Sequence, residues 1–327
     1  MTILVTGSAG HLGEAILRNL TAGGMSIKGL DIKASPFTGH IGSITDREFI
    51  RRCMKGVDVV IHPATLHKPH IATHTRQDFI DTNISGTLVL LEEAVAAGVR
   101  SFVFTSTTSA FGSALTPAAG EPAAWITEEV TPIPRNIYGV TKISAENLCE
   151  LFARKWHLPV IILRTSRFFP EADDNPDIRN QYDQANARAN ELLYRRVDIE
   201  DVVSAHLLAL EAAPRIGFGK YIISATTPFT PEDLATLRTD APRVVHRLFP
   251  DAAALFTARN WRLFPHIDRV YVNHRAIKEL NWQPRYDFRH VLNCLRAGKD
   301  FRSELAREVG SKGYHDIIFE HGPFPVE

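Results

Sequence analysis

Two side chains that can move protons stand four residues apart in the run Tyr138-Gly-Val-Thr-Lys142. Residues at this spacing share one face of a helix, so the phenol and the ammonium would point the same way. A free tyrosine has a pKa of about 10, which is too high for a base at neutral pH. A close positive charge favours the phenolate and lowers that pKa. The pair therefore predicts a proton-transfer site on a helix face.

A glycine-rich turn near the amino terminus has the composition of a phosphate site. The apolar run at 2–6 leads into Gly7-Ser-Ala-Gly10-His-Leu-Gly13, and a helical pattern follows at once. Glycines let the backbone turn sharply and approach a pyrophosphate closely. The helix amino terminus adds free N–H groups and the positive end of its dipole. A strand before and a helix after the glycines predict a dinucleotide site.

Asp31, at the end of the next β-rich run, indicates which dinucleotide is bound. A carboxylate there suits hydrogen bonds from the adenosine ribose hydroxyls and would repel a 2′-phosphate. Ile32 follows instead of an arginine, although Lys33 supplies one nearby cation. NAD is therefore expected as the cofactor rather than NADP.

The elements that must position these residues alternate between strand and helix in the first half of the chain. Such alternation predicts an α/β fold, a Rossmann-like doubly wound parallel sheet, with a smaller C-terminal substrate domain. The expected strands are 2–6, 26–31, 57–61, 101–105 and 159–164, and the expected helices are 11–22, 46–54, 78–97 and 138–156.

The later residues predict how the chain divides into domains. Residues 1–166 would form the NAD-binding domain, and a helix at 199–212 with a strand at 220–224 would return 197–225 to it. Residues 167–196 and 226–327 would form the substrate domain. Four prolines predict a long irregular loop at 113–136, and loops of that length are usually functional.

The overall composition narrows the classes of partner and compartment. Lysine plus arginine equals aspartate plus glutamate at 37 each, so neither nucleic acid nor an anionic membrane is an expected partner. Three scattered cysteines are too few for a disulfide framework. The first predicted strand begins at Thr2, which leaves no room for a signal peptide, and no apolar run has the roughly 20 residues of a membrane span. A cytoplasmic protein is expected.

Several motifs, in their order and spacing, resemble those of the extended short-chain dehydrogenase/reductase superfamily. The glycine turn has the spacing GxxGxxG, and the tyrosine and lysine match the motif YxxxK. The chain resembles the nucleotide-sugar epimerase branch of the NAD-dependent epimerase/dehydratase family in further segments, which are Phe104–Gly112, His62–Thr65, Asn83–Thr87, Val197–Asp201 and Leu280–Pro284.

The resemblance implies an enzyme and assigns roles to its residues. Aligning Phe111-Gly112 with the family's YG places a catalytic hydroxyl on Thr107, with Ser106 as the alternative. Tyr138 would then take the substrate hydroxyl proton while the carbon gives hydride to NAD, and Lys142 would also hold the nicotinamide ribose. The implied cofactor-binding residues are Gly7, Gly10, His11, Leu12, Gly13, Asp31, Ser43, Ile44, His62, Ala64, Asn83, Thr105, Tyr138 and Lys142.

Three outcomes can follow hydride removal: ketone release by a dehydrogenase, hydride return to the other face by an epimerase, or loss of water in a dehydratase. In 4,6-dehydratases of the superfamily, Asp-Glu follows the catalytic threonine, whereas Thr108 and Ser109 follow it here. Epimerase and dehydrogenase both remain. A non-catalytic NAD-sensing scaffold is a further alternative, which the intact Thr107, Tyr138 and Lys142 disfavour.

The expected substrate region departs from the nucleotide-sugar pattern. Arg167 replaces an asparagine that commonly contacts substrate, and Arg195 or Arg196 could meet a diphosphate bidentately. Arg262 lies near where epimerase relatives keep a phosphate-binding arginine. Each of these arginines is equally consistent with a solvated surface charge.

Acidic residues just after Arg167 argue for a smaller substrate. Glu171, Asp173 and Asp174 would repel a diphosphate if they faced the pocket, so a polyol, free sugar or sugar acid is an alternative substrate. The histidines at 62, 67, 70 and 74 lack a cysteine partner, and no metal is expected because the family needs none. By resemblance, the helices at 78–97 and 138–156 would pair with a partner's copies in a homodimer.

Overall fold

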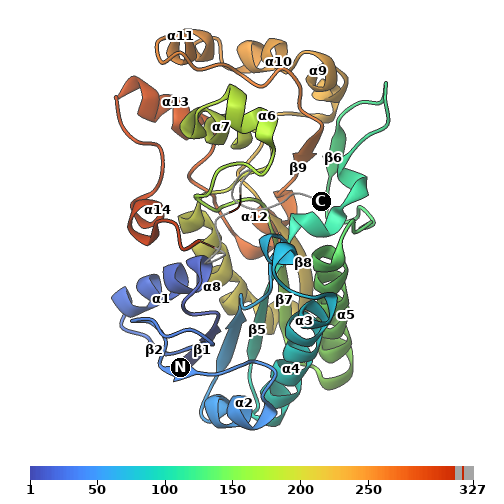
Figure 1. Cartoon of the computed structure of the whole chain (residues 1–327), viewed down its shortest axis with the longest axis vertical. Coiled ribbons are helices and arrows are strands. Elements are labelled where there is room, and N and C mark those ends of the chain that lie inside the picture. Colours follow the sequence, from blue (N-terminus) through green and yellow to red (C-terminus); the bar gives the residue numbers. More distant parts are fainter. Residues whose placement is uncertain (314–318, 320–327) are drawn as a thin grey trace.

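A computed structural model describes residues 1–313 and 319 of the chain (Figure 1). The end of the predicted substrate domain, at 314–318 and 320–327, lies outside the described residues. At the centre is a seven-stranded sheet in the order β3-β2-β1-β4-β5-β7-β8, with every neighbouring pair parallel. Its strands are β1 (Thr2–Thr6), β2 (Ser26–Asp31), β3 (His40–Ile41), β4 (Val59–His62), β5 (Ser101–Thr107), β7 (Val160–Thr165) and β8 (Phe218–Ile223).

Helices cover both faces of this sheet because its strands are apolar on both sides. Along β1, Ile3 and Val5 pack into one hydrophobic core and Leu4 into another, as the two-residue period of a strand requires. The first core also holds the helices α1 (His11–Ala22), α8 (Ile199–Ile216), α12 (His274–Leu280) and α14 (Glu304–Val309). The second core also holds α2 (Arg47–Met54), α4 (Gly86–Ala96) and α5 (Ile137–Trp156). The prediction of a Rossmann-like parallel sheet is confirmed.

The helix predicted at 78–97 consists of three consecutive segments. It begins earlier, with α3 (Arg76–Phe79), because Thr75 and Asp78 cap each other's backbone N–H groups. A π-helical segment (Ile80–Ser85) then joins α3 to α4. Apolar spacing does not distinguish a π turn from an α turn, so the sequence could not indicate it. π-helical turns are rare and frequently lie at functional sites.

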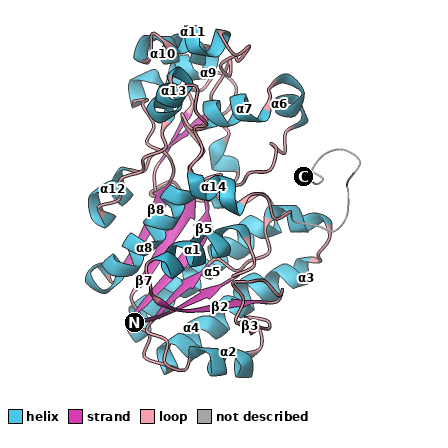
Figure 2. Ribbon diagram, turned by 90° about the vertical axis from the view of Figure 1, so that its left-hand side faces the viewer, coloured by secondary structure: helices cyan, strands magenta, loops and turns pink. Residues whose placement is uncertain are grey.

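A smaller unit with its own hydrophobic core stands at the carboxyl end of the central strands (Figures 1 and 2). Its helices are α6 (Pro176–Gln181), α7 (Gln184–Glu191), α9 (Leu234–Thr239), α10 (Ala241–Leu248), α11 (Ala252–Thr257) and α13 (Phe288–Arg296). Short 3-10 turns occur at Lys68–Ala72, Thr108–Phe111, Ser113–Leu115 and Pro231–Asp233.

Two features differ from the expected domain division. The 113–136 segment is not wholly irregular, because β6 (Ala124–Ile126) pairs in parallel with β9 (Arg269–Tyr271). In addition, α12 and α14 come from the predicted substrate domain but pack against the first core of the large sheet. The division at 166/167 and 225/226 therefore stays a prediction. No helix in the described part of the chain is long and apolar enough to cross a membrane.

Candidate active site

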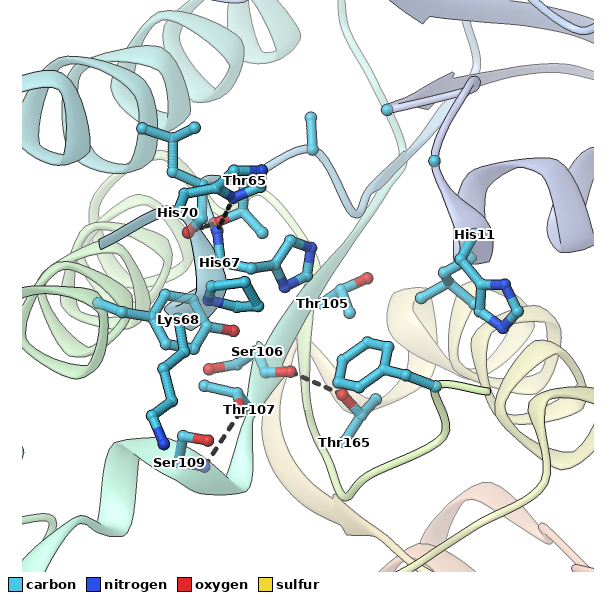
Figure 3. A pocket seen from close by; sticks show the side chains of 18 of the residues that line it. His11, Thr65, His67, Lys68, His70, Thr105, Ser106, Thr107, Ser109 and Thr165 are labelled. Atoms are coloured by element: carbon cyan, nitrogen blue, oxygen red, sulfur yellow. Dashed lines mark hydrogen bonds between the residues drawn. The ribbon is translucent and has the colours of Figure 1, made fainter. Parts of the chain in front are cut away.

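A cavity of about 1010 Å³ opens where the large sheet meets the smaller unit. It lies at the carboxyl ends of β1, β2, β5 and β7, the usual ligand position in open α/β sheets. Its lining includes the glycine turn, Asp31, the loop at 64–70, the end of β5 and Tyr138. Figure 3 shows Lys68, Thr107 and Ser109 gathered at one end of this space and His11 at the other.

The glycine turn between β1 and α1 is closely packed at two positions. Gly7 has φ +65°, and a Cβ there would lie 3.0 Å from the backbone of Ala64. A Cβ on Gly13 would lie only 1.9 Å from the carbonyl oxygen of Gly7. Gly10, His11 and Leu12 line the cavity, whereas Gly13 does not. Gly13 therefore has a packing role, which keeps the helix close to the turn, and its contact with the cofactor stays a prediction.

Asp31 lies beside the glycine turn at the end of β2. One carboxylate oxygen accepts from the backbone N–H of Ala9 at 3.0 Å, and the other accepts from that of Lys33 at 2.9 Å. Ser43 and Ile44 line the same end of the cavity. The Asp31 carboxylate can accept hydrogen bonds from ribose hydroxyls, and the adjacent glycine turn lets a pyrophosphate approach the backbone closely. This arrangement fits the adenosine half of a dinucleotide.

His62 lies behind the residues that line the cavity, because it is buried and does not line the cavity itself. Its Nδ1 lies 2.8 Å from the Thr6 hydroxyl, and its Nε2 lies 3.1 Å from that of Thr87. The Thr87 hydroxyl donates to the carbonyl of Asn83, so it accepts from Nε2–H, and Thr6 donates to Nδ1. Burial lowers the pKa of His62 to about 3, which keeps the ring neutral. The role of His62 in cofactor binding stays a prediction, and in this arrangement the ring lies behind the residues that line the cavity.

Asn83, in the π-helical segment, also lies behind the wall. Its carbonyl oxygen accepts from the backbone N–H of Leu66 at 2.8 Å, and its amide donates to the Leu66 carbonyl at 3.1 Å. The amide also donates to the Thr141 hydroxyl of α5 at 3.0 Å. Asn83 thus ties the cavity-lining loop to the helix that carries Tyr138, and it does so without lining the cavity itself.

Tyr138 lines the cavity near the amino terminus of α5, whereas Lys142 does not. The Lys142 ammonium donates to the carbonyl of Thr105 at 2.7 Å and lies 4.0 Å from the centre of the Phe104 ring. Burial lowers the pKa of Lys142 to about 7. Burial also raises the pKa of Tyr138 to about 12, and the Thr107 side chain opposes this rise. The pKa of the Tyr138 phenol is therefore raised by burial, and not lowered by Lys142 as the sequence predicts.

Thr107 and Ser106 point to opposite sides of β5, as neighbours in a strand must. Thr107 lines the cavity, its hydroxyl accepts from the backbone N–H of Ser109 at 3.0 Å, and its side chain also interacts with the Tyr138 hydroxyl. The Ser106 hydroxyl donates to Glu146 at 2.5 Å, and Glu146 is ion-paired with the buried Arg164. Only Thr107 of this pair directs its hydroxyl toward Tyr138.

A family model described as the NAD dependent epimerase/dehydratase family matches residues 3–222. The chain belongs to this family. NAD is therefore its cofactor, and the glycine turn and Asp31 are residues that fit it. Membership also makes the chain an NAD-dependent enzyme of the short-chain dehydrogenase/reductase type.

Three relatives illustrate the likeness. Sterol demethylase protein B of Methylococcus capsulatus is 29% identical over 307 residues, which are 88% of this chain and 90% of that protein. UDP-glucose 4-epimerase of Erwinia amylovora is 30% identical over 173 residues, which are 47% of this chain and 49% of that protein. A solved structure of UDP-glucose 4-epimerase from Thermotoga maritima with UDP-glucose has 25% identity and a TM-score of 0.60. That match covers 88% of this chain and 94% of the other. Apart from the sterol demethylase protein, the chain spans about half the length of the first curated relatives it matches.

On the substrate side, this member of the epimerase/dehydratase family has arginines already bound to carboxylates. Arg195 lies 2.7 Å from Asp173 and 2.6 Å from Glu191. Arg167 lies 3.6 Å from Asp174. Both arginines line the cavity, and Arg196, the alternative to Arg195, is buried against Glu191 and does not line it.

Arg262 is the predicted substrate residue that the fold places elsewhere. Its guanidinium is exposed, stacks 4.9 Å from the centre of the Tyr182 ring and donates to the carbonyl of Gln181. It does not line the cavity. The spacing of the motifs predicts where Arg262 lies along the chain. The direction of its side chain depends on the short helices around it, which the motifs do not describe.

Two cavity residues were missed by the sequence reasoning. The ring of His67 lies 6.0 Å from that of Tyr138, and burial lowers its pKa to about 3. The histidine cluster is predicted from the sequence to belong to a loop that covers the cofactor, with no role for His67 beside Tyr138. No group of three possible metal ligands occurs among the described residues. Arg269 of β9 also lines the cavity, and no motif marked it.

Proposed function

We propose that the protein oxidises a hydroxyl-bearing carbon of a sugar or nucleotide sugar through a keto intermediate, with NAD as the cofactor. One observation carries this proposal. Thr107 and Tyr138 face the same cavity as the glycine turn and Asp31. A substrate hydroxyl bound at Thr107 and Tyr138 therefore lies in the same cavity as a dinucleotide held at the glycine turn and Asp31.

The residues of the chain divide the work between them. Thr107, whose side chain faces Tyr138, orients the substrate hydroxyl by a hydrogen bond. Tyr138 takes the proton of that hydroxyl as general base, and any positive charge brought next to the phenol lowers its raised pKa. NAD, when bound, accepts the hydride. His67, which its lowered pKa keeps neutral, places its ring beside that of Tyr138 at this end of the cavity.

Two outcomes fit the same catalytic residues. An epimerase returns the hydride to the other face, and the similarity to UDP-glucose 4-epimerases supports this outcome. A dehydrogenase of a free sugar, sugar acid or other small alcohol releases the ketone. The ion pairs of Arg167 and Arg195 favour this second candidate, because these arginines are already neutralised.

Purified protein distinguishes these outcomes. Free sugars, sugar acids and nucleotide sugars are supplied singly with NAD, and NADH formation and isomer exchange are measured for each. A dehydrogenase makes NADH in proportion to product, whereas an epimerase exchanges isomers without net NADH. An NAD-binding scaffold turns over none of them, and that result would overturn the proposal.

Assembly and location extend the same proposal. We propose a cytoplasmic homodimer in which α4 and α5 meet the partner's copies. Val140 of α5 is half exposed, which supports an apolar contact on that face of the helix. A single-subunit mass in solution would contradict the dimer, and fractionation of cells tests the compartment.

A further inference from the structure

Arg269 is a cavity-lining cation whose side chain has no partner among the described residues. Its Nε is buried and makes no hydrogen bond, and its guanidinium forms no ion pair in the described part of the chain. Buried N–H groups are nearly always paired in native proteins, so an orphan of this kind needs an explanation. A ligand group that enters the cavity would supply the missing acceptor.

The other cations on the substrate side already have partners. Lys68 lies 2.7 Å from Asp174. The buried Nε groups of Arg167 and Arg195 also have no hydrogen-bond partner among the described residues, but both guanidinium groups form ion pairs through an Nη with the carboxylates described above. Arg135, which is exposed, donates to the hydroxyls of Ser113 and Thr116. Arg269 is therefore the substrate-side guanidinium in the described lining that is left to bind an anion.

The backbone that carries Arg269 is firmly held. Val270, the next residue, is fully buried in the core of the smaller unit and pairs with Trp125 of β6. The N–H of Tyr271 donates to the carbonyl of Tyr194 at 3.0 Å, and Tyr271 also lines the cavity. A guanidinium on a fixed strand presents its N–H groups in one orientation, which suits recognition of a planar anion.

The charge of the cavity limits that anion to a small one. Glu171 and Asp174 line the same cavity and would repel a group that carries several negative charges. A carboxylate carries one charge, and its two oxygens match Nε–H and a neighbouring Nη–H of arginine side by side. A nucleotide diphosphate would place at least two charges near these carboxylates and would find Arg167 and Arg195 already occupied.

We propose that Arg269 binds the carboxylate of a polyhydroxy acid, so that the substrate is a sugar acid rather than a nucleotide sugar. This inference rests on the proposed function and names the substrate class of the same cavity. The carboxylate is held at β9, while the hydroxyl to be oxidised is held at Thr107 and Tyr138.

The test compares four probes with NAD-loaded enzyme: glucuronate, glucose, glucose 6-phosphate and UDP-glucose. We expect turnover of glucuronate with the highest kcat/KM. In Arg269→Gln we expect KM for glucuronate to rise about 10- to 100-fold, the range for a lost hydrogen bond to a charged group. The Kd for NAD and the slow turnover of glucose should stay within twofold of the wild type.

Two further variants control for general effects. Arg243→Gln removes an exposed arginine from α10 of the same smaller unit and should leave every value unchanged. Arg269→Lys keeps the charge but loses the paired N–H groups, so its KM should lie between those of the wild type and Arg269→Gln. Since the Arg269 guanidinium forms no ion pair among residues 1–313, thermal unfolding of both Arg269 variants should match the wild type.

The possible failures are separable. If the wild type prefers UDP-glucose or glucose 6-phosphate and Arg269→Gln retains that activity, the proposed function stands and this inference falls. If the wild type turns over none of the four probes, binding of glucuronate to NAD-loaded protein is measured by calorimetry. Absence of binding, or equal binding by Arg269→Gln, also overturns the inference.

Discussion

At the scale of single residues, Asp31 decides which dinucleotide the cavity accepts. Asp31→Ala removes a negative charge and an acceptor for ribose hydroxyls. We expect the affinity for NAD to fall about 10-fold or more, and the preference for NAD over NADP to shrink, because the charge that repels a 2′-phosphate is gone. Calorimetric Kd values for both cofactors check this.

Asp31→Asn is the matched control for that experiment. It keeps an acceptor for the backbone N–H of Ala9 but removes the charge. It should therefore preserve the turn while still relaxing the preference. An unaltered ratio of the two Kd values in both variants would remove Asp31 from cofactor selection.

Some site residues could be predicted because residues close in sequence determine their positions. Others could not, because their positions depend on residues far away in the chain. Asp31, Thr107 and Tyr138 could be placed from the sequence, because each lies next to the end of a strand or helix that its own neighbours define. His62 and Arg262 could not, since their surroundings come from residues far away in the chain. His62 meets Thr6, and Arg262 meets Gln181.

At the scale of elements, the contact between β1 and α1 holds the glycine turn in place. Gly13→Ala would put a Cβ 1.9 Å from the Gly7 carbonyl oxygen, so the helix must move away from the turn. We expect NAD binding to weaken at least 10-fold and the free energy of unfolding to fall by about 1–3 kcal/mol, the usual cost of overpacking. Titration with NAD and urea unfolding measure the two effects.

Gly23→Ala, at the other end of α1, is the control for overpacking. Its Cβ would meet nothing closer than 3.5 Å, and its backbone has an ordinary negative φ. This variant should bind NAD as the wild type does. Equal NAD binding by Gly13→Ala would show that the helix does not need to stay close to the turn.

The central elements were predictable because buried parallel strands are continuous apolar runs with turn residues between them. The irregular parts were not. The pairing of β6 with β9 joins segments more than a hundred residues apart, and neither three-residue strand has a pattern of its own. Arg269 was missed for this reason, since its place in the cavity depends on that pairing.

At the scale of the whole molecule, buried neutral histidines make the stability depend on pH. Burial lowers the pKa of His206 to about 4, and its Nδ1–H donates to the carbonyl of Val202 while Nε2 accepts from Thr105. Below a pH of about 6.5 the unfolded chain binds a proton at this ring, whereas the folded chain does not until near pH 4. Folding stability contributed by His206 is therefore present above pH 6.5 and is lost as the pH falls toward 4.

His206→Gln tests this dependence, because an amide can make both hydrogen bonds but does not titrate. Between pH 5.5 and 4.5 the wild type should lose about 1.2 kcal/mol more stability than the variant. Urea unfolding at the two pH values gives the difference. Parallel losses in the two proteins would mean that His206 titrates alike in the folded and unfolded chains.

In the whole molecule, the glycine turn of the large sheet and Arg269 of β9 line one cavity, and Tyr138 lines it as well. The most direct test of this arrangement is Tyr138→Phe, assayed for turnover and for NAD binding on the same preparation. We expect turnover to fall about 10²- to 10⁴-fold, the usual contribution of a general base, while the Kd for NAD changes by less than about twofold. Turnover at the wild-type rate in Tyr138→Phe would contradict the assignment of the active site.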